Sequence, residues 1–229
     1  MQYVITGANR GIGLEFVEQL LERGNHIIAT ARQPARADEL QSLAKSYRDQ
    51  LEIARLDVTE KDTIDALVEL VGDRGVDVLI NNGATMIGAG PIDDLNEQAL
   101  FDSFDVNTVG PLRVSSALLP ALERSDQPKI VNVTSKMGSI ADNGSGGSYA
   151  YRISKAALNM ATRSMAIDLE PRGIVAFVIH PGWVRTRMGG QNALIDTETS
   201  VTNMLRIIDE ADRSTAGTFQ EWNGNVIPW

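Results

Sequence analysis

The sequence predicts an α/β fold: a single domain over residues 1–229, with a doubly wound, mostly parallel sheet and helices on both faces. Short apolar segments alternate with segments whose apolar residues recur at helical spacing. The short segments are apolar throughout, which is typical of parallel strands covered on both sides. Because crossovers between parallel strands are right-handed, this alternation closes as a sheet between two helical layers.

The alternation can be followed along the whole chain. Strands are expected at residues 3–6, 26–32, 51–58, 76–81, 129–135 and 174–180. Helices are expected over 14–21, around 40–43, and over 64–71, 97–122, 149–169 and 200–210, with a short edge strand near 225–229. In such sheets ligands bind at the carboxyl ends of the strands, so the functional residues should directly follow strands.

Composition excludes several classes of function. The net charge of −9 opposes binding to nucleic acid or to anionic lipid. Cysteine is absent, and the two histidines, His26 and His180, stand far apart with no second ligand at metal spacing, so neither disulfides nor a metal site are expected. There is no visible secretory signal and no apolar run of about 20 residues, so we expect a cytoplasmic protein with no membrane partner.

A glycine-rich loop, TGANRGIG, joins the first strand to the first helix. Gly7 suits a tight turn, Gly11 lets the backbone approach a pyrophosphate, and Gly13 lets the helix pack closely on the strand. The amides of the helix N-terminus would then face the anion. No Gly-Lys-Ser/Thr sequence ends the loop, so it is not a P-loop.

The three residues between Gly7 and Gly11 give this loop a spacing that resembles the short-chain dehydrogenase/reductase family. The resemblance implies a Rossmann fold that binds a nicotinamide dinucleotide. It also implies which loop residues contact the coenzyme: Gly7, Asn9, Arg10, Gly11, Ile12 and Gly13.

The end of the second strand predicts the choice of coenzyme. NAD-binding folds usually place an acidic residue there to bind the ribose 2′-hydroxyl, but this chain has Ala31 followed by Arg32. A guanidinium pairs with a 2′-phosphate, and Arg10 stands where the family often carries a second basic residue. We therefore expect NADP(H) rather than NAD(H).

Two further strand ends match the family. In the resemblance, Asp57 and Val58 flank the adenine ring after the third strand, and Asn82 and Gly83 lie against the coenzyme after the fourth. The fourth strand ends in NNGA, where the family normally has Asn-Asn-Ala-Gly. A backbone that needs glycine at the fourth position would be strained by Ala84.

The stretch YRISK places Tyr151 one helical turn before Lys155, a pairing that none of the other three tyrosines has. With Asn107 and Ser135, these residues match the catalytic tetrad of the family in order. The resemblance implies that Tyr151 is the general acid and that Lys155 lowers its pKa and bonds the nicotinamide ribose. It also implies that Ser135 orients the carbonyl oxygen and that Asn107 supports a proton relay.

The segment HPGWVRTRM follows the sixth strand. By the same resemblance, Pro181 and Gly182 form the family's turn, and Val184 and Thr186 bond the nicotinamide carboxamide. His180 is interpreted as a strand-end residue rather than a ligand or base. The glycine-rich stretch at residues 141–148 lengthens the interval between the serine and the tyrosine, and we expect it to form a surface loop beside the site.

The segments YAYRISKAALNM, HPGWVRTRMGG and NVIPW resemble the family branch that contains sniffer-type carbonyl reductases and C-factor proteins. The leading hypothesis is an NADPH-dependent reductase of a small aldehyde or ketone. One alternative is an NAD-dependent alcohol dehydrogenase, and another is a dinucleotide-binding signalling or interaction protein. A small carbonyl compound is the expected partner. The resemblance also implies a homodimer or homotetramer formed through the helices of Asn107 and Tyr151.

Overall fold

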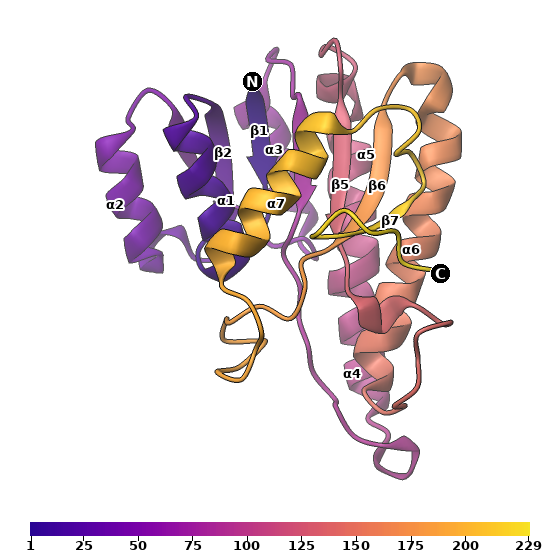
Figure 1. The fold of residues 1–229 in the computed structure, drawn as a ribbon. Helices are drawn as coiled ribbons and strands as arrows, with labels where there is room; N and C mark the ends of the chain where they lie inside the picture. Colours follow the sequence, from indigo (N-terminus) through magenta and orange to yellow (C-terminus); the bar gives the residue numbers. More distant parts are fainter.

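The computed structural model describes residues 1–229 and contains one sheet in which all neighbouring strands are parallel (Figure 1). Its seven strands have the order β3-β2-β1-β4-β5-β6-β7. The strands are β1 (Gln2–Ile5), β2 (His26–Ala31), β3 (Leu51–Arg55), β4 (Val78–Asn81), β5 (Lys129–Val133), β6 (Val175–His180) and β7 (Phe219–Glu221). The predicted doubly wound parallel sheet is confirmed, and the first six strands lie where the sequence places them.

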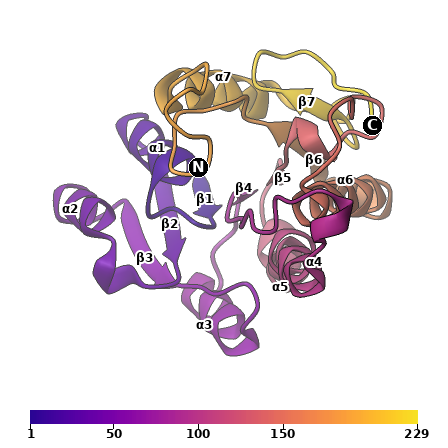
Figure 2. The same ribbon diagram turned by 90° about the horizontal axis from the view of Figure 1, so that it is seen from below.

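Helices cover both faces of the sheet (Figure 2). One layer consists of α1 (Gly11–Glu22), α2 (Asp38–Ser46) and α7 (Thr197–Glu210), and the other of α3 (Lys61–Val71), α5 (Gly110–Leu122) and α6 (Tyr149–Leu169), with α4 (Glu97–Phe104) beside α6. Because side chains alternate along a strand, Tyr3 and Ile5 enter the core under α1 while Val4 enters the opposite core. Each helical layer thus has its own apolar core on a shared sheet.

The long helical region predicted over residues 97–122 is present, but it is not uniform. Between α4 and α5 the chain forms one wide π-helical turn, Asp105–Val109. Such turns insert an extra residue into a helix and occur frequently at functional sites. This turn carries Asn107, so the irregularity lies at a predicted site residue.

The predicted position of the edge strand was wrong. The seventh strand is β7, which pairs in parallel with β6, whereas the segment at 225–229 contributes only a single antiparallel bridge between Val226 and Gln220. A tight turn at Gly224, with φ of +90°, folds the chain back so that Ile227 N donates to Phe219 O at 2.7 Å. The terminal segment therefore lies on β7 rather than on β6.

A chain of buried polar side chains crosses the core between β4, β5 and α6. Asn81 Nδ2 donates to Asn132 Oδ1 at 2.8 Å and to Ser115 Oγ at 3.1 Å. Asn132 Nδ2 in turn donates to Thr162 Oγ1 at 2.8 Å. Buried polar groups are tolerated when they form hydrogen bonds with one another. This hydrogen-bond network therefore fixes how β4 and β5 are aligned with each other and with the helices that carry Ser115 and Thr162.

The outer surface of α6 carries apolar side chains at Ile153, Met160 and Ile167, and α4 adds exposed Phe101 and Phe104.

No helix is both long enough and apolar enough to cross a membrane. The predicted homodimer or homotetramer stays a prediction.

We predict that Asn132→Ala lowers the free energy of unfolding by about 2–3 kcal/mol, because it removes two buried hydrogen bonds, one from Asn81 Nδ2 and one to Thr162 Oγ1. Urea unfolding of the two proteins measures this change. The control is Asn203→Ala, whose side chain bonds only its own exposed helix and whose loss should cost less than about 0.5 kcal/mol. Equal effects of the two substitutions would contradict the assigned role.

Candidate active site

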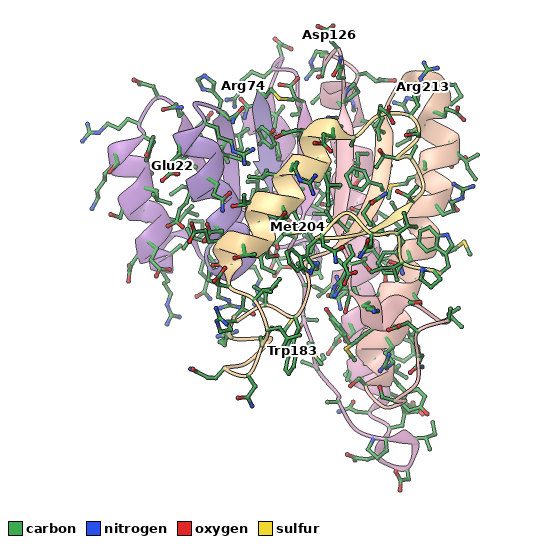
Figure 3. All side chains as sticks on the ribbon, in the orientation of Figure 1. Glu22, Arg74, Asp126, Trp183, Met204 and Arg213 are labelled. Carbon is green, nitrogen blue, oxygen red and sulfur yellow. The ribbon has the colours of Figure 1, made fainter.

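The site lies where the strand order reverses. The chain first runs outward from β1 to β3 and then returns to the other side of β1 at β4. Beyond the turns that end β1 and β4, the chain continues to opposite faces of the sheet, and α/β sheets bind ligands at the carboxyl edge at such a point. Figure 3 shows Trp183 at this edge, on the segment between β6 and α7.

The glycine loop has the geometry that the sequence predicts. Gly7 and Gly11 adopt left-handed φ angles of +65° and +54°. A Cβ on Gly13 would lie 2.3 Å from Gly7 O, so only glycine allows α1 to sit this close to β1. Arg10 is the N-cap of α1 and makes no capping hydrogen bond with its side chain. The first amides of the helix are thus available to an anion.

Thr6 and Asn82 fasten the glycine loop to the end of β4. Thr6 Oγ1 accepts hydrogen bonds from the amides of Asn82 and Gly83, both at 3.0 Å. Asn82 Nδ2 donates to Thr6 O and Gly7 O, both at 3.1 Å.

Ala84 does not have a positive φ, so the altered order of small residues in NNGA causes no left-handed strain.

Arg10, in the glycine loop, feels the charges of two other arginines. Burial and the nearby charges of Arg187 and Arg32 lower the pKa of Arg10. None of the three forms an ion pair. Arg187 was not predicted as a site residue, although the Arg-Thr-Arg sequence after the proline-glycine turn offered a signal. Only the tertiary structure places Arg187 near Arg10. Its neighbour Thr186 packs beside Gly11, with Thr186 Cγ2 3.3 Å from where a Cβ on Gly11 would stand.

Asp57 and Val58 follow β3, as predicted. Asp57 Oδ1 accepts hydrogen bonds from Thr59 N at 3.0 Å and from Thr59 Oγ1 at 2.7 Å. Burial acts to raise the pKa of the Asp57 carboxyl, but these bonds and the charge of Arg32 lower it overall. Val58 lies against Gly110, where a Cβ would come within 2.5 Å of it. Asp57 therefore caps its own turn while remaining beside the arginines.

Tyr151 and Ser135 are both buried, with 7% and 9% of their surfaces exposed. Burial raises the pKa of Tyr151, and the nearby Ser135 hydroxyl offsets only part of that rise. Ser135 Oγ accepts a hydrogen bond from Met137 N at 3.2 Å, which leaves the hydroxyl proton free to point elsewhere.

Lys155 is buried beside this pair. Its Nζ lies 5.8 Å from the centroid of the Tyr151 ring and donates to Val133 O at 2.8 Å. Burial lowers the pKa of Lys155 to about 7. The predicted lowering of the tyrosine pKa is not found: the pKa of Tyr151 is raised, because its burial outweighs the opposing effect of Ser135.

Asn107 connects the π-helical turn to its neighbours. Its Oδ1 accepts from Thr85 N, and its Nδ2 donates to Thr85 O, both at 2.8 Å. The same Nδ2 donates to Ser154 Oγ at 2.9 Å, and Ser154 Oγ donates to Tyr151 O at 2.8 Å. Asn107 therefore fixes the turn of α6 that carries Tyr151. A proton relay through Asn107 stays a prediction.

The segment after β6 leads from the carboxyl edge of the sheet to α7. Gly182 has φ of +86°, and a Cβ there would strike the Trp222 ring. Val184 pairs with Ile195, and Thr186 Oγ1 accepts from Gly189 N at 3.1 Å.

Two residues join that segment to the sheet and to α7. Pro181 O accepts a hydrogen bond from Ser200 Oγ at 2.6 Å. His180 ends β6, as predicted, and burial is the main cause that lowers its pKa to about 4.

Residues 2–194 match the family described as short chain dehydrogenase. The chain belongs to the short-chain dehydrogenase/reductase family. The predicted resemblance is thereby confirmed, and this chain is an oxidoreductase of that family.

Two groups of relatives extend this result. This short-chain dehydrogenase/reductase is 47% identical to C-signal of Myxococcus xanthus over 154 residues, which cover 67% of the chain and 93% of that protein. The structure of the carbonyl reductase Sniffer of D. melanogaster superposes with a TM-score of 0.95 and 36% identity, covering 100% of this chain and 99% of that one. A carbonyl reductase from chicken fatty liver, solved with NADPH bound, has a TM-score of 0.93 and 36% identity and covers 100% and 98% of the two chains. The predicted branch is confirmed.

The buried ammonium group predicts a pH dependence of stability. The pKa of Lys155 is about 7 in the folded protein, against an ordinary value of 10.5. Between pH 7 and pH 10.5, Lys155 is therefore protonated in the unfolded chain but largely neutral in the folded protein. Stability should therefore rise with pH in this window, and Lys155 should contribute about 2 kcal/mol between pH 7 and pH 9. Urea unfolding of the coenzyme-free protein should show this rise reduced in Lys155→Met and retained in Lys45→Met, a substitution at the exposed surface of α2. Identical slopes in all three proteins would refute the shift.

Proposed function

We propose that this protein is an NADPH-dependent reductase of small aldehydes or ketones, with Tyr151 as the proton donor. The observation that carries the proposal is the buried cluster of Tyr151, Ser135 and Lys155 at the carboxyl edge of the sheet. The similarity to Sniffer and to the chicken carbonyl reductase supports the reaction class.

Each residue of the cluster has a separate task in carbonyl reduction. A reduced nicotinamide, when bound, supplies hydride to the carbonyl carbon. Ser135 donates its free proton to the carbonyl oxygen and holds it near Tyr151. The raised pKa of Tyr151 keeps the phenol protonated at neutral pH, as a proton donor requires. Negative charge then forms on the phenol, and the ammonium form of Lys155 stabilises it.

The coenzyme site is built from two donor sets. The uncapped N-terminus of α1 and the glycine turn at Gly7–Gly13 fit a pyrophosphate. The unpaired guanidiniums of Arg10, Arg32 and Arg187 fit a ribose 2′-phosphate, which distinguishes NADP(H) from NAD(H). The adenine would be held by Asp57 and Val58. The nicotinamide end of the coenzyme would be held by Pro181, Gly182, Val184, Thr186 and Lys155.

We expect Tyr151→Phe to lower kcat for NADPH-dependent reduction of an aldehyde by roughly 10²–10⁴-fold, because the proton donor is lost. The dissociation constant for NADPH, measured by quenching of tryptophan fluorescence, should change little. The control is Tyr149→Phe, which removes a phenol two residues away on the same helix and should keep kcat. A Tyr151→Phe enzyme with wild-type turnover would eliminate the proposed mechanism.

Arg187→Ala should raise the dissociation constant for NADPH by roughly 10-fold or more and leave that for NADH nearly unchanged, because only NADPH carries the 2′-phosphate. Titration of each coenzyme by fluorescence measures both constants. Arg185→Ala is the matched control, since its guanidinium pairs with Asp196 at 3.2 Å on the exposed surface. A similar loss of affinity for both coenzymes would remove the phosphate assignment.

A second candidate function is that of a dinucleotide-binding signalling or interaction protein, which the similarity to C-signal supports. The Tyr151→Phe variant separates the two candidates in a cell that depends on this gene. Loss of both turnover and cellular phenotype supports the reductase. Loss of turnover with the phenotype retained supports the signalling protein.

A further inference from the structure

Arg152, the residue directly after Tyr151, connects three segments of the site. Its Nε donates to Gly146 O and to Gly147 O, both at 3.2 Å. Its Nη1 donates to Met137 O at 3.3 Å, and its Nη2 donates to Ser145 Oγ at 2.7 Å. No carboxylate pairs with this guanidinium, so all of its bonds go to neutral oxygens of two loops.

The bond to Met137 O acts on Ser135 through one peptide unit. The carbonyl of Met137 and the amide of Gly138 belong to the same peptide, and Gly138 N donates to Ser135 O at 2.8 Å. Met137 N donates to Ser135 Oγ in the same turn. The backbone and the hydroxyl of Ser135 are therefore both held by a turn whose outer carbonyl is bonded by Arg152. Because Arg152 and Tyr151 are adjacent on α6, this link sets the position of one hydroxyl relative to the other.

The bonds to the glycine-rich loop restrain a strained backbone. Gly146, Gly147 and Ser148 have successive φ angles of +63°, +62° and +49°, and Ser148 is the one non-glycine residue in the chain with a positive φ. Such a conformation in a residue with a side chain is unfavourable and persists only where neighbours hold it. Arg152 bonds the two carbonyls before Ser148, and Ser148 N donates to Ala89 O at 3.3 Å. The loop is thus fixed between α6 and the segment that follows β4.

We propose that Arg152 is a positioning residue of the active site. It keeps Ser135 in position relative to Tyr151, and it holds the loop at 145–148 against the segment around Ala89. Its kinetic consequence rests on the proposed reductase function, whereas its structural consequence does not.

The kinetic test compares Arg152→Ala and Arg152→Lys with the wild type. If Ser135 moves relative to Tyr151, kcat for aldehyde reduction should fall by roughly 10- to 100-fold in Arg152→Ala, while the dissociation constant for NADPH stays within about twofold. Added guanidinium ion should restore part of kcat to the alanine variant, since it can replace the missing donors. Arg152→Lys should retain an intermediate kcat, because one ammonium cannot reach all four acceptors.

The matched control is Arg163→Ala, on the same helix. Its guanidinium also donates to a neutral carbonyl, Gly217 O at 3.4 Å, but this contact lies away from the glycine-rich loop. This variant should keep the wild-type kcat. Arg152→Ala with unchanged kcat, or with an equal loss of kcat in Arg163→Ala, would overturn the kinetic role.

Hydrogen–deuterium exchange of the coenzyme-free protein gives the second readout. Peptides that contain residues 137–138 and 146–148 should exchange at least tenfold faster in Arg152→Ala than in the wild type or in Arg163→Ala. Unchanged exchange there overturns the positioning role, whatever the enzyme activity. If instead the wild type reduces no carbonyl compound while the exchange of these peptides still depends on Arg152, the proposed function fails and the positioning role stands.

Discussion

The structure depends on the contact between the turns that end β1 and β4. A Cβ on Gly7 would lie 2.7 Å from the Cα of Gly83, so the two backbones meet without any side chain between them. Thr6 and Asn82 bond this junction from both sides. Because the strand order reverses here, the same contact fixes where α1 begins at the carboxyl edge of the sheet. The proposed anion site depends on this contact for its shape.

Burial is the second constraint, and it acts in opposite directions on the pKa values of the two ionisable groups of the proposed catalytic cluster. It raises the pKa of the phenol of Tyr151 and lowers that of the ammonium of Lys155, so both neutral forms are favoured. The raised pKa of Tyr151 suits the proposed proton donor, which must begin protonated, whereas the lowered pKa of Lys155 opposes the ammonium form that would stabilise the phenolate. The hydrogen bond from Lys155 to Val133 O compensates part of the cost of burying an amine. Burial of Lys155 thus costs the protein stability, while burial of Tyr151 keeps its phenol protonated.

Charge is distributed locally rather than globally. The chain as a whole is acidic, with a net charge of −9, yet the charges of Arg32 and Arg187 act on Arg10, and none of the three arginines forms an ion pair with a carboxylate. The mutual repulsion of these guanidiniums is unfavourable in the free protein and would be relieved by a bound phosphate. Arg152 differs from them, because its donors are already satisfied by carbonyl and hydroxyl oxygens. The arginines proposed to bind phosphate therefore differ from Arg152 in having no partner within the protein.

The sequence by itself determined the alternation of strands and helices, the parallel sheet and the strand ends that carry Gly7, Ser135 and Pro181. Local periodicity and motif spacing suffice for these features, because they depend on residues close together in the chain. Only the tertiary structure decided that β7 precedes the terminal segment, that Arg187 joins Arg10, and that burial of Tyr151 raises its pKa. These outcomes depend on which distant residues come into contact and on how much water they exclude, and neither is encoded in local spacing.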